Sequence, residues 1–81
     1  MIKVVFFAQV KELVGQSALE LDDSFTTAEH IRLHLCEQGD RWARALESGK
    51  LLVAINQKIS PMTACVSAGD EVAFFPPVTG G

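Results

Sequence analysis

The segment that constrains the fold most is the last one, Phe74-Phe75-Pro76-Pro77-Val78-Thr79-Gly80-Gly81. Its two aromatic residues end a predicted strand. The prolines lack an N–H group and have a fixed φ, so they cannot continue a sheet interior and instead keep the chain extended. The glycines have no Cβ, so another protein can approach their backbone closely. We therefore expect a globular domain over residues 1–75 and an extended tail over 76–81, whose free carboxylate suits a narrow active site on a partner.

The size and composition of the chain limit what the rest can do. A chain of 81 residues makes one small domain, which buries only about 60% of its surface and has little room for a substrate cavity. Its 48% hydrophobic and 21% charged residues are typical of a packed globule. The net charge is −3 and the basic residues form no cluster, which argues against a nucleic-acid partner.

The two cysteines, Cys36 and Cys65, lack C-x-x-C spacing. We expect reduced, partly buried thiols; the sequence also allows the alternative of a single disulfide between the two cysteines. The N-terminal residues read as a strand and not as a signal peptide, and no apolar run has the length of a membrane span. We therefore expect a cytoplasmic protein with no membrane contact.

Five segments have the β-branched and aromatic composition or the turn borders of strands. They are residues 2–7, 17–21, 51–55, 58–59 and 71–75. A helix that begins at Thr26, which has capping-box spacing to Glu29, or at Thr27 separates the first two strands from the others. Its apolar stripe is formed by Ala28, Ile31 and Leu35.

Two shorter helices complete the predicted elements. Residues 10–14 should turn Leu13 and Val14 inward, and Asp40 should cap a helix that carries Trp42 into the core. Two hairpins then flank a helical crossover, and parallel pairing of the first and last strands would lay the main helix across one sheet face. This predicts an α+β fold of the β-grasp type, with a mixed sheet packed on one main helix.

Three segments of this order resemble the small subunit of molybdopterin synthase, a family of ubiquitin-like sulfur carriers. They are Ile2-Lys3-Val4 through Phe7-Ala8-Gln9-Val10, Asp40-Arg41-Trp42-Ala43, and Gly69-Asp70-Glu71-Val72-Ala73 through Gly81. The resemblance covers nearly the whole chain, and the last segment is its specific part.

The resemblance implies a chemistry for the tail. A ubiquitin-activating-type enzyme would adenylate the Gly81 carboxylate with ATP, and a sulfur donor would displace AMP to leave a thiocarboxylate. That sulfur, next to Gly80, would attack a cyclic pterin precursor held in the large synthase subunit, and so build the molybdopterin dithiolene of the molybdenum cofactor. The chain would then be a non-catalytic subunit of a heterotetrameric sulfurtransferase, would bind no cofactor itself, and would leave ATP to the adenylating partner.

A partner-binding surface is expected at the base of the tail. If the core-facing strand residues point at the helix, then Phe7, Ile59 and Phe75 form an exposed apolar patch, with Lys11 and Lys58 at its rim. The tail residues expected to enter the partner are Pro76, Pro77, Val78 and Thr79.

A pair of histidines and three alternative functions also have to be considered. His30 and His34 have a helical metal-binding spacing, but they fall opposite the apolar stripe, so we expect solvated side chains and no metal site. A carrier for thiamine or tRNA thiolation would use the same tail chemistry. A ubiquitin-like protein modifier or a pure interaction module would not.

Overall fold

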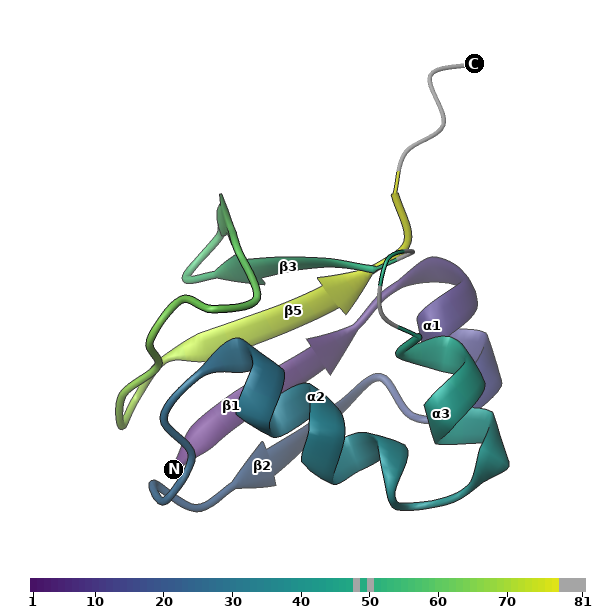
Figure 1. Ribbon diagram of the computed structural model, residues 1–81, viewed down its shortest axis with the longest axis horizontal. Helices are drawn as coiled ribbons and strands as arrows, with labels where there is room; N and C mark the ends of the chain where they lie inside the picture. The colour runs from purple at the N-terminus through teal and green to yellow at the C-terminus, as the bar shows by residue number, and fades with distance from the viewer. Residues whose placement is uncertain (48, 50, 78–81) are drawn as a thin grey trace.

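A computed structural model of the protein describes residues 1–47, 49 and 51–77 (Figure 1). Its elements are β1 (Ile2–Phe6), α1 (Ala8–Val14), β2 (Ala18–Leu21), α2 (Ala28–Cys36), α3 (Asp40–Ala45), β3 (Leu52–Ile55), β4 (Lys58–Ser60) and β5 (Glu71–Phe75). The strands form one mixed sheet in the order β2-β1-β5-β3-β4. Only β1 and β5 pair in parallel, and the other neighbours are antiparallel. The predicted β-grasp architecture, including the parallel pairing of the first and last strands, is confirmed.

The helices cover one side and one end of this sheet. Figure 1 shows α2 lying across a single sheet face, while α1 and α3 pack together at the end where β1 and β5 finish. The main core therefore lies between α2 and alternate residues of the strands. Its largest fully buried side chains are Phe6, Phe74, Ile2, Ile31, Leu35, Leu46, Val4, Val53 and Val72.

Aromatic contacts join α3 to the sheet. The ring centroids of Trp42 and Phe6 are 5.6 Å apart in an edge-on arrangement, and Phe6 stacks on Phe74 at 6.5 Å. Trp42 is half-buried and packs against the core cluster, so the sequence-based placement of this residue in the core is confirmed in part.

Helix boundaries depart from the sequence prediction at several positions. α1 begins at Ala8, two residues earlier than expected, and buries Val10 and Val14. The prediction that Leu13 faces inward is wrong, because residues four apart share a helix face and Leu13, next to Val14, lies 40% exposed. The prediction that Asp40 caps α3 is also wrong, because Gly39 holds the cap position and Asp40 lies in the first turn.

The structure shows which of the two predicted residues, Thr26 or Thr27, caps the start of α2. Thr27 has extended backbone angles, and its side-chain oxygen accepts a hydrogen bond from the His30 N–H at 3.0 Å. This bond satisfies one of the free N–H groups that every helix start presents. The Thr26 N–H instead donates to His30 Nδ1 at 3.3 Å. The predicted capping box is therefore absent among these residues, and the alternative cap is confirmed.

Candidate partner-binding surface

The sheet face opposite α2, here called the open face, carries three rows of side chains. Alternation along β1 and β5 puts residues there that point away from the core, and the register fixes their neighbours on β2, β3 and β4. The middle row is wholly apolar across the five strands: Ala18, Val5, Ala73, Ala54 and Ile59.

The other two rows differ sharply in polarity. The row nearer the tail consists of Phe75, its β3 partner Leu52, and Phe7, whose backbone N–H donates to the Phe74 carbonyl at 3.2 Å. The row at the far end is charged, with Glu20, Lys3 and Glu71 as neighbours. The open face therefore becomes more apolar toward the point where the tail leaves the domain.

Two large side chains stand out from this face. Phe7 is 51% exposed and Ile59 is 73% exposed. Between them Ala54 and Ala73 are buried although no described helix lies over them, because a methyl group is shielded by the larger side chains around it. The two small alanines thus lie between two large exposed apolar side chains. A partner side chain could insert between Phe7 and Ile59, which is a typical arrangement for a docking surface.

The three residues predicted for the patch have different degrees of exposure. Phe7 and Ile59 are exposed, and Phe75 is half-buried at the end of β5. The backbone turns away directly after Phe7, because Ala8 has a φ of +52° and leads into α1. Phe7 is therefore held at the end of the sheet by an immediate change of chain direction.

The two predicted rim lysines are both exposed, in different surroundings. The Lys11 N–H donates to the Phe7 carbonyl at 3.3 Å, so this residue lies one helical turn from the patch. Lys58 precedes Ile59 on β4 and pairs with Ile55, a residue packed against the core. Its side chain therefore starts from the opposite sheet face, and only Lys11 is a neighbour of the open face by backbone geometry.

The base of the tail lies against α1 and α3. Pro76 is half-buried and Pro77 is exposed. Pro76 lines a cleft with Gln9, Val10, Leu13, Arg44, Ala45 and Glu47. Leu13, wrongly placed in the core from the sequence, is thus part of the wall beside the tail. The predicted site residues Val78, Thr79, Gly80 and Gly81 lie outside the described part of the chain.

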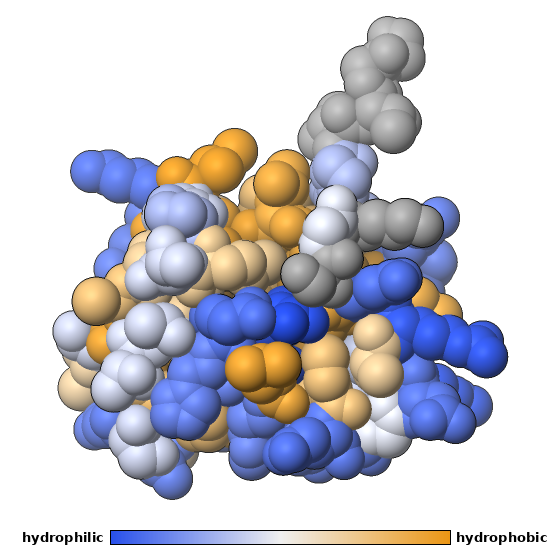
Figure 2. Space-filling model, viewed as in Figure 1, coloured by the Kyte–Doolittle hydropathy of each residue, from blue (hydrophilic) through white to orange (hydrophobic). Residues whose placement is uncertain are grey.

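Figure 2 shows the α2 side of the molecule, which contrasts with the open face. Hydrophilic and apolar atoms are mixed on this side: apolar atoms gather over the β3–β4 hairpin and beside the base of the tail, and a smaller apolar group lies among hydrophilic atoms near the middle of the view. Leu33, 52% exposed, is the exposed large apolar side chain of α2.

The two histidines differ in exposure: His30 is exposed, as predicted, whereas His34 is half-buried. The rings of His30 and His34 pack on Phe25, with centroids 4.7 and 4.9 Å away. Phe25 is 8% exposed. Among residues 1–47, 49 and 51–77, no group of three or more His, Cys, Asp and Glu side chains is arranged to hold a metal ion. Cys36 is half-buried and Cys65 is exposed; both are free thiols, so the expected partial burial applies to Cys36 alone.

No helix in the described part of the chain has the length and hydropathy needed to cross a membrane.

Sequence reasoning found part of this surface and missed the rest. The alternation that placed Phe7 and Phe75 on one side also places Val5 and Ala73 there. Leu52, Ala54 and Ala18 become neighbours of these residues only through the strand register, which local sequence does not specify.

Comparisons with known proteins agree on the kind of chain this is. The model of the ThiS family matches residues 4–81. A molybdopterin synthase sulfur carrier subunit from Haemophilus influenzae is 60% identical over 81 residues, and the one from Escherichia coli K12 is 59% identical; both alignments cover 100% of each chain. A crystal structure of small archaeal modifier protein 1 from Haloferax volcanii is 26% identical, covers 95% of this chain and 97% of that one, and superposes with a TM-score of 0.73.

Proposed function

Since the chain belongs to the ThiS family, we propose that it is the sulfur-carrying small subunit of a molybdopterin synthase. The observation that carries this proposal is the full-length alignment, at 60% identity, with a curated sulfur carrier subunit of that enzyme. The apolar open face beside the tail adds physical support, because a carrier must dock on other proteins to deliver its cargo.

In this proposal the carrier works through its last residue. An oxygen of the Gly81 carboxylate attacks the α-phosphorus of ATP in the adenylating partner, pyrophosphate leaves, and an acyl-adenylate forms. Hydrosulfide released by a sulfur donor attacks the carbonyl carbon and loses its proton, AMP leaves with the bonding electron pair, and a thiocarboxylate remains on Gly81. Activation is needed because a free carboxylate has a poor leaving group, whereas the thiocarboxylate sulfur is a strong nucleophile, as thiolates are.

The second half of the cycle takes place on the large subunit. The thiocarboxylate sulfur bonds to a carbon of the cyclic pterin precursor, and the oxygen substituent of that carbon leaves with its bonding electron pair. Hydrolysis of the resulting thioester would leave the sulfur on the pterin as a thiolate and return the Gly81 carboxylate. Two charged carriers are consumed for each dithiolene, because it contains two sulfur atoms. The large subunit supplies the substrate pocket and the proton-transfer groups, which fits an 81-residue chain with little interior to spare for a cavity.

The described residues have binding roles in this scheme. Phe7, Ile59 and Phe75 dock the open face on a partner, with Lys11 at the side of Phe7. Pro76 and Pro77 stiffen the start of the tail, since proline restricts φ and reduces the entropy that ordering the tail would cost. Val78, Thr79 and Gly80 would then reach into the partner, and Lys58 would contact it from the β4 edge.

Intact-mass measurement tests the central step. The purified full chain is incubated with an adenylating enzyme of the ubiquitin-activating type, ATP and a sulfur source. We expect one oxygen of the C-terminal peptide to be replaced by sulfur, and we expect no change in a chain that lacks Gly81. An unchanged wild-type mass, or conjugates with other proteins, would favour a modifier or an interaction module instead.

A second assay identifies the sulfur acceptor. The charged chain is mixed with the large synthase subunit and the cyclic pterin precursor, and the dithiolene product is measured. Product formation supports the synthase subunit. A chain that carries sulfur but yields no dithiolene would instead be a carrier for another acceptor, such as thiamine or tRNA.

A further inference from the structure

We propose that Arg32 is a positioning residue that fixes the base of the tail by holding the carboxyl end of α3. This inference rests on the proposed function, because it concerns how the tail is presented to an adenylating partner. Arg32 lies on α2 and does not touch the tail, so it would act through α3.

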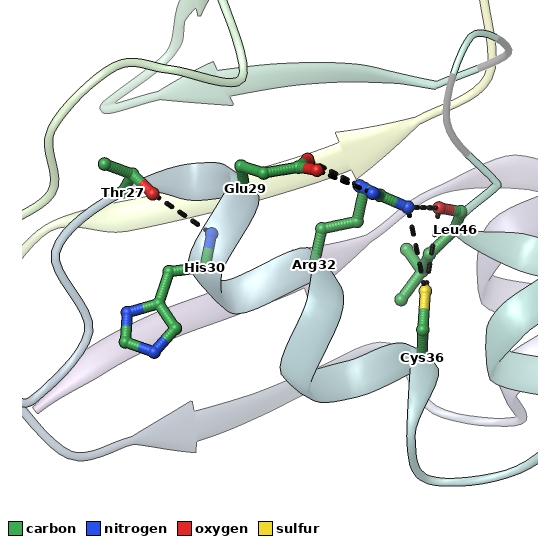
Figure 3. A network of polar contacts seen from close by, with 6 residues as sticks. All are labelled: Thr27, Glu29, His30, Arg32, Cys36 and Leu46. Carbon is green, nitrogen blue, oxygen red and sulfur yellow. Dashed lines mark hydrogen bonds and ion pairs between the residues drawn. The ribbon is translucent and has the colours of Figure 1, made fainter.

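The Arg32 side chain is almost fully enclosed and uses its donors on two elements. Figure 3 shows it between Glu29 on its own helix and the end of α3. Its Nε and Nη2 donate to the two Glu29 carboxylate oxygens at 2.6 and 2.7 Å, and its Nη1 donates to the Leu46 carbonyl at 2.9 Å. Arg32 is only 8% exposed. Long charged side chains are almost never this buried unless they are paired.

The hydrogen bond to Leu46 satisfies a backbone carbonyl group at the carboxyl end of α3. The last carbonyl groups of a helix have no partner within it, and Leu46 caps the carboxyl end of α3. Water cannot readily replace the arginine, because Leu46 is fully buried. The guanidinium also places a positive charge at the negative end of the helix dipole. The pairing with Glu29 orients the planar fork, which a lysine would not match.

α3 depends on such contacts for its position. It has six residues, and no side chain caps its start at Gly39. A helix this short is not stable by itself, so its place is set by its neighbours. Two α2 side chains bond the Leu46 carbonyl at its carboxyl end: Arg32, whose Nη1 donates at 2.9 Å, and Cys36, whose Sγ donates more weakly at 3.8 Å.

Three connections run from α3 to the base of the tail. Trp42 contacts Phe6, which stacks on Phe74 in β5. Ala45 and Pro76 line the same cleft. The chain that leaves α3 after Leu46 enters β3 at Leu52, which pairs with Phe75, the last residue of β5. A shift of α3 would therefore move the wall and the strand end from which the tail departs.

Steady-state kinetics of charging by the adenylating enzyme separates docking from tail delivery. The open face should determine the KM for the carrier, and tail placement should determine kcat. We expect Arg32→Met to lower kcat about tenfold with KM within twofold of wild type, because small misplacements of a reacting group are costly. Val66→Ala removes buried volume at the loop that bonds Thr26, at the α2 start, and serves as the control for lost stability with both constants unchanged.

Two further variants make the test specific. Glu29→Gln keeps the Arg32 bond to Leu46 and should retain most of kcat. Arg32→Lys loses the planar guanidinium but keeps a positive charge that can donate to the Leu46 carbonyl, so it should restore part of kcat relative to Arg32→Met. The proposal is overturned if Arg32→Met leaves kcat within twofold of wild type, or if Val66→Ala lowers kcat equally.

Backbone amide NMR shifts provide a readout that does not depend on the reaction. In Arg32→Lys, and in Arg32→Met if it folds, we expect changes at Ala45 and at Phe75. Shifts confined to α2 would refute the positioning role. If the wild-type chain is not charged at all, the proposed function fails, and the amide shifts still decide whether Arg32 positions the base of the tail.

Discussion

Removal of the two exposed apolar side chains of the open face should weaken partner binding without unfolding the protein. Phe7 is 51% exposed and Ile59 is 73% exposed. Full burial of such side chains contributes about 1.5–3 kcal/mol. Burying the fraction that is still exposed would therefore contribute roughly 1 kcal/mol of binding free energy at Phe7 and somewhat more at Ile59. Phe7 directly follows β1 and Ile59 lies on β4, three strand spacings or roughly 14 Å away across the sheet, so their effects should add.

The double variant Phe7→Ala/Ile59→Ala should therefore lose about 2–3 kcal/mol of binding free energy. That loss corresponds to a rise in Kd of roughly 30- to 150-fold. Isothermal titration calorimetry against the large subunit measures it, and a thermal melt checks that the variant is folded.

Leu33→Ala is the matched control for this experiment. Leu33 is 52% exposed, nearly the same as Phe7, but it lies on α2 and outside the open face. We expect its Kd to stay within twofold of wild type. The reasoning is refuted if the double variant binds as tightly as wild type, or if Leu33→Ala weakens binding by as much as the double variant.

Four other perturbations test the core, the partner surface, the β3–β4 turn and the half-buried Arg32–Glu29 ion pair. Phe74→Ala should lower the free energy of unfolding by about 3–5 kcal/mol in a denaturant titration, whereas Phe75→Ala should mainly weaken partner binding, by roughly 2 kcal/mol if it is a hot spot. Gln57→Gly should raise the unfolding free energy by about 0.5 kcal/mol, because Gln57 has a φ of +71° in the β3–β4 turn and glycine avoids that strain. The hydrogen bond from Arg32 lowers the pKa of Glu29 below its ordinary value of 4.5. The ionised Glu29 carboxylate therefore stabilises the fold fully above pH 4.5, and this stabilisation is lost as the pH falls through the lowered pKa of the folded state. Melting temperatures should drop more steeply below pH 4.5 for wild type than for Glu29→Gln.

The sequence predicted the sheet and its main helix because their signals are local and strong. The bounds of β5 are confirmed as predicted, and the helical stripe of Ala28, Ile31 and Leu35 is buried as expected. Leu13 was placed wrongly because periodicity over a seven-residue helix cannot choose between adjacent apolar residues. The four-residue spacing of Val10 and Val14 determined the buried side.

Arg32 and Phe25 could not be identified from local pattern. A charged residue on an amphipathic helix is normally assigned to solvent, and the Leu46 carbonyl that Arg32 bonds lies fourteen residues later. Phe25 sits in a loop between β2 and α2, where no periodicity applies. The roles of both residues are visible only when the fold brings distant segments together. The middle row of the open face could not be predicted for the same reason, because it depends on which residues pair between strands.

The end of β5 shows how one strand can serve stability and docking at once. Phe74 is fully buried and stacks on Phe6, while Phe75, the next residue, belongs to the open face. Because neighbouring residues of a strand point to opposite faces, the core and the partner surface use different side chains of the same backbone. The backbone that the core holds rigid is therefore the one that continues into Pro76 and the tail. Under the proposed function, the strand from which the tail departs would therefore help to position the Gly81 carboxylate in the partner.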